Sequence, residues 1–304
     1  MRDGVLFFAG SEDDHQLRFP GPDGDLRFLS HLEEIPNASG EGFTGMEIYN
    51  RHTDEKDETA FEEYLRTAIK NPTEWSSLAR LQSLYPDEVF NAGTDYWPTI
   101  FAIWDRELAK HPFTGIGAND SHQNQIFNSV TFDPYEVGFR SVVTHILAQQ
   151  LTQQAIRESL RAGRVYVAHD WICDPSGFSF AVINSKGVHA MGDRVPMLAG
   201  THLQARVPVV ADLRLIHNGA IVAEQTGTEI DFVPNEAGAY RLEAWLAIDS
   251  EQRPWIYSNP IYLQKPKTPP ARSSTEGRTP IELGEIRLVG SPLVVGMVQR
   301  QARP

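Results

Sequence analysis

The chain has 304 residues, of which 41% are hydrophobic, and this size and composition suit two packed domains. Forty acidic residues against 27 basic ones give a net charge of -13, and no Lys/Arg-rich run occurs, so nucleic acid is not expected as a main partner. The single cysteine, Cys173, excludes an intrachain disulfide and a cysteine-rich zinc site. Histidine, aspartate and glutamate remain as candidate metal ligands.

Residues 1–132 alternate short apolar runs with longer stretches of helical periodicity, which is the pattern of a β/α domain. Helices with apolar stripes are predicted at 60–69, 75–85 and 100–108, all between the last two predicted strands. Polar residues at the ends of such strands usually share one face, so we expect the functional site there. The predicted strands cover residues 5–9, 26–32, 45–50 and 113–118.

Residues 133–163 are predicted to form a helical connector, with Thr152 as the N-cap of its second half and Gly163 at its end. From residue 164 the hydrophobic period changes to two, and about eight short strands follow. Asn218-Gly219 predicts a two-residue hairpin between two of them. Short strands at regular spacing without helices between them predict an immunoglobulin-like β-sandwich over residues 164–264.

Residues 265–304 contain several prolines and serines and are predicted to be a linker and C-terminal tail, in which the apolar residues 286–298 could add one or two strands. No apolar run is long enough to span a membrane, and the first residues are too short for a signal peptide. As written, the sequence therefore predicts a cytoplasmic protein without a membrane partner. A secreted or periplasmic location would require a signal peptide ahead of Met1. The pattern gives no indication of the oligomeric state.

Carboxylates and imidazoles occur at or just beyond the end of every predicted strand in the first half. Taken singly, each has an ordinary explanation as part of a solvated loop, a core histidine or an ion-pair partner. Four successive strands that bring such donors to one edge favour a metal site, because neutral imidazole and ionised carboxylate are the usual ligands of zinc, manganese and iron. The donors are Glu12 and His15 after the first strand, His31 at the end of the second, Glu47, Asn50 and His52 along and beyond the third, and Asp120 and His122 after the fourth.

Other chemistries have little support in the sequence. No G-x-S-x-G elbow of a serine hydrolase and no glycine-rich phosphate-binding loop is present, and Cys173 lacks an activating context. The main alternative to an enzyme is a non-catalytic binding or structural protein, in which the β-sandwich recognises carbohydrate or protein. Trp171, Trp245 and Trp255 are the aromatic residues that could stack on sugar rings in that case.

The donor segments read Phe8-Ala9-Gly10-Ser11-Glu12, Phe28-Leu29-Ser30-His31, Gly45-Met46-Glu47-Ile48-Tyr49-Asn50 and Gly117-Ala118-Asn119-Asp120-Ser121-His122. They resemble motifs in the C-terminal part of the PHP (polymerase and histidinol phosphatase) superfamily of metal-dependent phosphoesterases. Residues 164–260 are similar to a β-sandwich appended in a bacterial PHP-like subgroup. The resemblance implies a distorted (β/α) barrel whose C-terminal rim binds two or three zinc, manganese or iron ions. It also implies hydrolysis of a small, phosphorylated substrate.

The resemblance implies that the metal ligands are Glu12, His15, His31, Asp120 and His122. Of these, Glu12, Asp120 and His122 would also be catalytic. Glu47, Asn50 and His52 would contact the ligands without binding the metal themselves. The family opens with an H-x-H pair that this sequence lacks. We therefore expect either a truncated chain that begins inside the barrel or a degenerate form without full metal occupancy.

The predicted fold is thus α/β plus all-β, with the C-terminal part of a PHP-like (β/α) barrel over residues 1–132 and the immunoglobulin-like β-sandwich after the connector. The predicted function is that of a metal-dependent, phosphoesterase-like hydrolase. An incomplete barrel would leave it inactive.

Overall fold

The computed structural model describes residues 11–13, 15–57, 59–248, 250–266 and 293–297. Within these ranges strands dominate, with 41% strand against 24% helix. The strands form a five-stranded sheet, an eleven-stranded sheet and the two-stranded hairpin of β6 (Ile126–Phe127) and β7 (Val130–Thr131). No helix in the described part of the chain is long and apolar enough to cross a membrane.

The first sheet has the order β1-β2-β3-β4-β5, in which β1, β2 and β3 are antiparallel neighbours and β3, β4 and β5 run parallel. Its last three strands confirm the predictions at 26–32, 45–50 and 113–118, whereas the strand predicted at 5–9 lies outside the described residues. Every residue of β4 and β5 is buried, because both faces of this part of the sheet are covered. The strands are β1 (Ser11–Asp13), β2 (Gln16–Phe19), β3 (Leu26–Leu29), β4 (Gly45–Asn50) and β5 (Thr114–Ala118).

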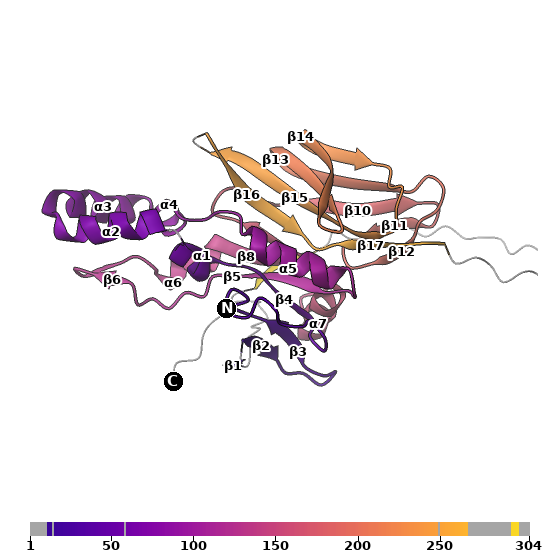
Figure 1. Ribbon diagram of the computed structural model, residues 1–304, viewed down its shortest axis with the longest axis horizontal. Coiled ribbons are helices and arrows are strands. Elements are labelled where there is room, and N and C mark those ends of the chain that lie inside the picture. The colour runs from indigo at the N-terminus through magenta and orange to yellow at the C-terminus, as the bar shows by residue number, and fades with distance from the viewer. Residues whose placement is uncertain (1–10, 14, 58, 249, 267–292, 298–304) are drawn as a thin grey trace, which may run out of the picture.

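Five helices connect β4 to β5. The predicted helices at 60–69, 75–85 and 100–108 correspond to α2, α3 and α5, and Pro98 occupies the first turn of α5, where a proline costs no hydrogen bond. Figure 1 shows α2 and α3 extending away from the two sheets, while α5 lies between them. The helices are α1 (Arg51–Asp57), α2 (Thr59–Lys70), α3 (Pro72–Leu84), α4 (Pro86–Phe90) and α5 (Pro98–Leu108).

The predicted partial (β/α) barrel is wrong. In the described residues the first sheet is open, and no further parallel strand continues it beyond β5. The outer edge of β5 is instead bonded by side chains. Asn259 bonds the N–H and the carbonyl oxygen of Gly115 at 2.8 Å each, and Thr144 Oγ1 accepts from Gly117 N at 2.9 Å and donates to its oxygen at 3.1 Å. Since these groups already have partners, the edge of β5 does not require another strand.

The second sheet also differs from the prediction, because it is not confined to a separate immunoglobulin-like sandwich. Its order is β11-β10-β13-β15-β16-β9-β8-β18, with β14 beside β13, and β17 between β15 and β12. β13 and β15 change neighbours along their length, so the sheet folds over a core that includes Phe180, Leu213, Leu242 and Trp255.

The strands of the second sheet are β8 (Val142–Ala148), β9 (Val165–His169), β10 (Ser179–Asn184), β11 (Gly187–Ala190), β12 (Arg194–Pro196), β13 (His202–His217), β14 (Ala220–Phe232), β15 (Gly238–Ile248), β16 (Glu251–Ser258), β17 (Ile261–Gln264) and β18 (Leu293–Met297). The hairpin predicted at Asn218-Gly219 is confirmed: the φ angles are 48° and 85°, and His217 pairs with Ala220.

The connector predicted as helical over residues 133–163 contains a strand. α6 (Tyr135–Ser141) and α7 (Gln153–Ala162) are helices, but β8 lies between them and pairs with β9 in the large sheet. The caps of α7 are as predicted, since Thr152 Oγ1 accepts from Ala155 N at 3.2 Å and Gly163 has a left-handed φ of 74°. The sequence pattern did not predict β8, because this strand is buried along nearly its whole length and shows no alternation of polar and apolar residues.

A buried ion-pair network fastens α5 to the large sheet. Arg241 of β15 donates from Nε and Nη2 to the two carboxylate oxygens of Asp105 at 2.9 Å each, and from Nη1 to Glu243 at 2.5 Å. The guanidinium also lies over the rings of Phe101 and Trp104. The middle of α5 is therefore fastened to β15.

The first prediction concerns Asn259, whose side chain is fully buried between β5 and β9. Replacement of Asn259 by alanine is expected to lower the free energy of unfolding by about 3 kcal/mol, because it leaves buried backbone groups of Gly115 without a partner. Urea denaturation measures this loss. The exposed Asn235 provides the control, since Asn235→Ala should change stability by less than about 0.5 kcal/mol. Equal stability of the two variants would contradict this role of Asn259.

Candidate metal centre

Asp120 lies at the centre of a group of histidines contributed by separate segments. Its carboxylate, 2% exposed, follows β5; Oδ1 is 3.8 Å from Nε2 of His122, and Oδ2 is 3.7 Å from Nε2 of His31, which follows β3. His52, on the first turn of α1, has its ring centroid 4.8 Å from that of His122. One donor atom each from His52, Asp120 and His122 lies within 4.8 Å of the others. This group could hold a metal ion.

The separations within the group fit shared ligation better than hydrogen bonding. A gap of 3.7–3.8 Å is too long for a hydrogen bond. Two ligands at metal bonds of about 2.0–2.2 Å in tetrahedral geometry are about 3.4 Å apart, so a small side-chain movement would let one ion contact both. His122 Nδ1 is also buried without a hydrogen-bond partner among the described residues, which is costly for a polar atom. Imidazole and carboxylate donors therefore fit a divalent cation here.

Local backbone geometry sets the direction of three predicted ligands. His15, His31 and Asp120 have φ angles of 57°, 49° and 49°, in the left-handed region that non-glycine residues rarely adopt. Each such residue costs about 1–3 kcal/mol and persists only where the surrounding structure imposes it. The side chain of Asn119 supplies part of that restraint, because it bonds both the N–H and the carbonyl oxygen of Val142 on β8. This backbone conformation directs the side chains of His31 and Asp120 toward each other.

Glu33 orients His31, a role that the sequence analysis missed. His31 Nδ1 is 3.1 Å from Glu33 Oε1, which also accepts from Thr53 Oγ1 at 3.3 Å, so Nε2 of His31 faces Asp120. Burial opposes ionisation of Glu33, but its hydrogen bonds with His31, its own backbone and Thr53 hold its pKa below the ordinary value. A carboxylate behind a ligating histidine is a common arrangement at metal sites. Its signal in the sequence is the spacing His31-Leu32-Glu33.

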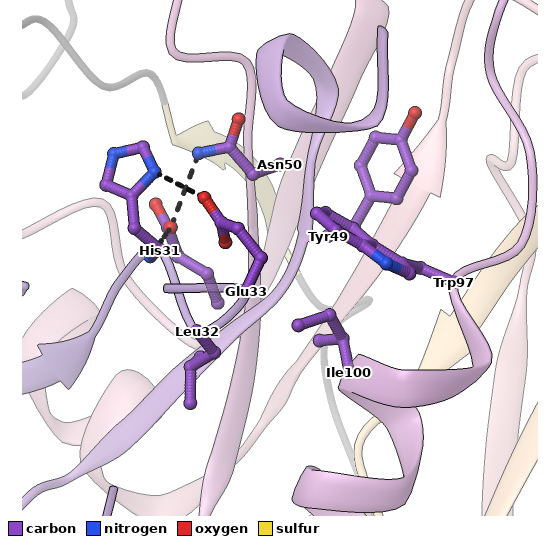
Figure 2. Close-up of a pocket in the computed structure, with 8 residues that line it drawn as sticks. His31, Leu32, Glu33, Tyr49, Asn50, Trp97 and Ile100 are labelled. Carbon is purple, nitrogen blue, oxygen red and sulfur yellow. Dashed lines mark hydrogen bonds and ion pairs between the residues drawn. The ribbon is translucent and has the colours of Figure 1, made fainter. Parts of the chain in front are cut away.

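Glu47 and Asn50 lie behind His31. Glu47 Oε2 accepts from the backbone N–H of His31 at 3.3 Å and from Asn50 Nδ2 at 3.4 Å. Asn50 Oδ1 in turn accepts from Thr53 N at 3.2 Å at the start of α1. Figure 2 shows His31 directed toward Glu33, with Asn50 beside them, at a pocket of about 10 Å³ that also includes Tyr49, Trp97 and Ile100. Glu47 and Asn50 thus hold the backbone at His31 in place through hydrogen bonds.

The structure places three further predicted site residues as follows. His52, expected to support the ligands, is a member of the group with Asp120 and His122. His15 is not in that group; its Nε2 is 3.8 Å from the exposed Glu34, and a third of its side chain is exposed. Glu12 belongs to β1, but the position of its side chain lies outside the described part of the structure.

A layer of buried polar groups lies below this edge. Tyr49 donates to Asp54 Oδ2 at 2.5 Å, and the N–H of Asp95 donates to the same oxygen at 3.0 Å. Burial raises the pKa of Asp54 to about 8. His169 is fully buried against Tyr49 and Tyr257, at ring-centroid distances of 4.6 and 5.8 Å, and burial together with the charge of Arg253 lowers its pKa to about 3. His169 is therefore neutral near neutral pH.

Comparisons of the chain with protein-family models, curated proteins and solved structures found no match. They do not identify a PHP superfamily member, so that resemblance stays a prediction. The chemistry of the site is inferred from its own residues.

The second prediction concerns acid sensitivity. Between its ordinary pKa of 6.5 and about 3, His169 takes up a proton in the unfolded chain but not in the folded one, so its contribution to stability is lost as the pH falls through this window. In His169→Phe, the free energy of unfolding should fall less steeply as the pH is lowered, by up to about 1.4 kcal/mol per pH unit. Urea denaturation at several pH values from about 7 down to 5 measures the slope. His202→Phe, at an exposed site, should keep the wild-type slope; an unchanged slope in His169→Phe would contradict the assignment.

Proposed function

We propose that the chain is a metal-dependent hydrolase of the phosphoesterase type, with its metal centre built on Asp120. The observation that carries this proposal is the buried carboxylate whose two oxygens face histidines from different segments at 3.7 and 3.8 Å. His52, Asp120 and His122 would hold a divalent cation, and His31 faces the other oxygen of Asp120. The left-handed backbone at His31 and Asp120 supports the proposal, because such strain concentrates at catalytic and binding sites.

A divalent cation held there would activate water for attack and offset negative charge that develops on a phosphoryl oxygen. The protein residues would fix the geometry beforehand. Glu33 holds the ring of His31, Asn119 anchors the turn that carries Asp120, and the phenol of Tyr135 donates to the carbonyl oxygen of His122 at 3.2 Å. Such second contacts limit ligand movement and so strengthen metal binding. Local positive charge from cations is also what an acidic chain needs to attract an anionic substrate.

The alternative of a carbohydrate-binding sandwich lacks support at two of the three tryptophans on which it depended, while the third, Trp171, is half-buried. Trp255 is fully buried and donates to Cys173 O at 2.8 Å, and Trp245 is 6% exposed and donates to Glu243 Oε2 at 3.1 Å. Their rings pack in the interior and are not available for stacking on a sugar.

The third prediction tests the metal centre. Purified protein loaded with Zn²⁺ or Mn²⁺ and freed of excess ion should retain metal, whereas Asp120→Asn and His122→Ala should lose most of it, because each removes a donor from the group. Inductively coupled plasma mass spectrometry gives the stoichiometry. Hydrolysis of p-nitrophenyl phosphate and of its bis-ester should fall at least about 100-fold in the same variants.

The control for these variants is His202→Ala, which removes a partly exposed histidine paired with Asp231 on the large sheet. This variant should bind metal and hydrolyse both esters as the wild type does. Unchanged stoichiometry in Asp120→Asn would exclude the metal centre. Metal binding without hydrolysis of either ester would exclude the phosphoesterase assignment while leaving the metal site intact.

The fourth prediction concerns Glu33. Glu33→Gln keeps the shape of the side chain but removes the charge behind His31, so metal affinity should fall about 10- to 100-fold with little change in folding. Competition with a chromogenic chelator measures the affinity, and circular dichroism checks the fold. Glu41→Gln, in an exposed loop, serves as the matched charge control. Equal affinities of the two variants would mean that Glu33 does not act on the metal site.

A further inference from the structure

A second pocket lies at the opposite end of α5 from the metal centre. Its volume is about 570 Å³, which suits a small molecule. It is lined by the C-terminal end of α5 and the residues that follow, by β12, by β17 and by the start of β15 (Figure 1). Ile100 of the first turn of α5 lines the pocket beside His31, whereas Leu108, two turns further along, lines this one. The two sites are therefore distinct.

Positive charge gathers around this second pocket. Its lining includes Lys110, His111 and Arg194, and it includes no aspartate or glutamate. Arg194 is exposed, and its side chain makes no hydrogen bond or ion pair with any residue that the structure describes. Lys110 and His111 both lie beside the carboxylate of Glu107, at 2.8 and 3.7 Å, whereas the side chain of Arg194 has no carboxylate partner among the described residues.

The neighbouring carboxylates already have partners, and those of Glu107 include the pocket residues Lys110 and His111. Glu107, almost fully buried, accepts from Arg106 Nε at 3.1 Å, from Lys110 Nζ at 2.8 Å and from the N–H of Gly40 at 3.3 Å. Asp193, the neighbour of Arg194, pairs with Arg164 at 3.4 Å and accepts from the N–H of Ala190 at 3.0 Å. The charge of Arg194 is thus left to face the pocket without compensation by a neighbour.

Tyr262 adds a hydrogen-bond donor between the basic residues. It pairs with Arg194 across the parallel strands β12 and β17, so the two side chains are neighbours. Its hydroxyl oxygen accepts from Phe113 N at 3.1 Å, which leaves its own proton for another acceptor. Burial raises the pKa of Tyr262, so that the phenol keeps this proton at neutral pH.

We propose that this pocket binds a small anion, a molecule that carries a phosphate or carboxylate group, through Arg194, Lys110 and the hydroxyl of Tyr262. A guanidinium presents paired donors that match either oxyanion, and charge-assisted hydrogen bonds of this kind are the stronger ones in proteins. The pocket does not depend on the metal centre, because it uses none of its residues. It is a second ligand site of the chain, whatever reaction the first one performs.

Isothermal titration calorimetry of the full chain tests this site, after treatment with a chelator so that phosphate cannot bind through metal. Orthophosphate and succinate are titrated separately at constant ionic strength, which separates phosphate from carboxylate recognition. Wild-type protein should bind at least one of them. Arg194→Gln should weaken binding about tenfold, as expected for the loss of one charge-assisted contact, and addition of Lys110→Gln should abolish it.

Arg206→Gln is the matched control, because it removes the same charge from an exposed arginine on β13 that pairs with Glu229. It should bind the anion as the wild type does. Equal weakening by Arg206→Gln and Arg194→Gln would show a general charge effect and overturn the proposal, as would the absence of millimolar binding of both probes to the wild type. Melting temperatures without ligand verify folding of each variant. Metal retention by the same proteins reports on the metal centre separately.

Discussion

The outer edge of β5 is the constraint on which the arrangement of both sheets depends. A buried edge strand must satisfy its backbone groups, and in β5 two side chains from the second half of the chain, Asn259 and Thr144, do so at Gly115 and Gly117. Gly117 makes the approach of the large sheet possible, because a Cβ there would meet Val167 of β9 within 3 Å. Gly115 gives the same kind of room to Trp104 of α5 and Ile48 of β4. The large sheet therefore packs directly against β5, in the place where a barrel would add another parallel strand.

That packing also positions the candidate metal centre. Once β5 is fixed, the loop beyond it is held to β8 through Asn119, and Asp120 is turned into its left-handed conformation beside His31. His52 reaches the same place because α1 begins directly after β4, the parallel neighbour of β5. The ligand group is thus assembled from three strand ends at one edge of an open sheet. A closed barrel is not needed for donors to converge, since parallel neighbours already end on the same side.

α5 links this edge to the rest of the molecule. Its N-terminal turn borders the pocket beside His31, its middle is fastened to β15 by the Asp105–Arg241 pair, and its C-terminal end borders the cationic pocket. The ion pair is buried, and burial of an unpaired charge would destabilise the fold. The two hydrogen bonds from the guanidinium to Asp105 and its contact with the carboxylate of Glu243 offset that cost. The helix consequently lies between the candidate metal centre and the proposed anion pocket.

The sequence by itself determined the features that depend on local chemistry. Asn218-Gly219 specified its hairpin, Thr152 and Gly163 specified the ends of α7, and the strand-end donors pointed to Asp120, His122 and His31, because caps, tight turns and apolar runs are set by residues close together in the chain. Tertiary structure alone decided the rest. β8 is buried on both faces and so has no alternation of polar and apolar residues that would predict a strand. Glu33 and His52 lie beside the other candidate ligands only because the fold brings separate segments together. A barrel does not form because the side chains of the distant Asn259 and Thr144 occupy the edge of β5. Such long-range pairings leave no periodic signal in the residues around them, so they could not be read from the sequence.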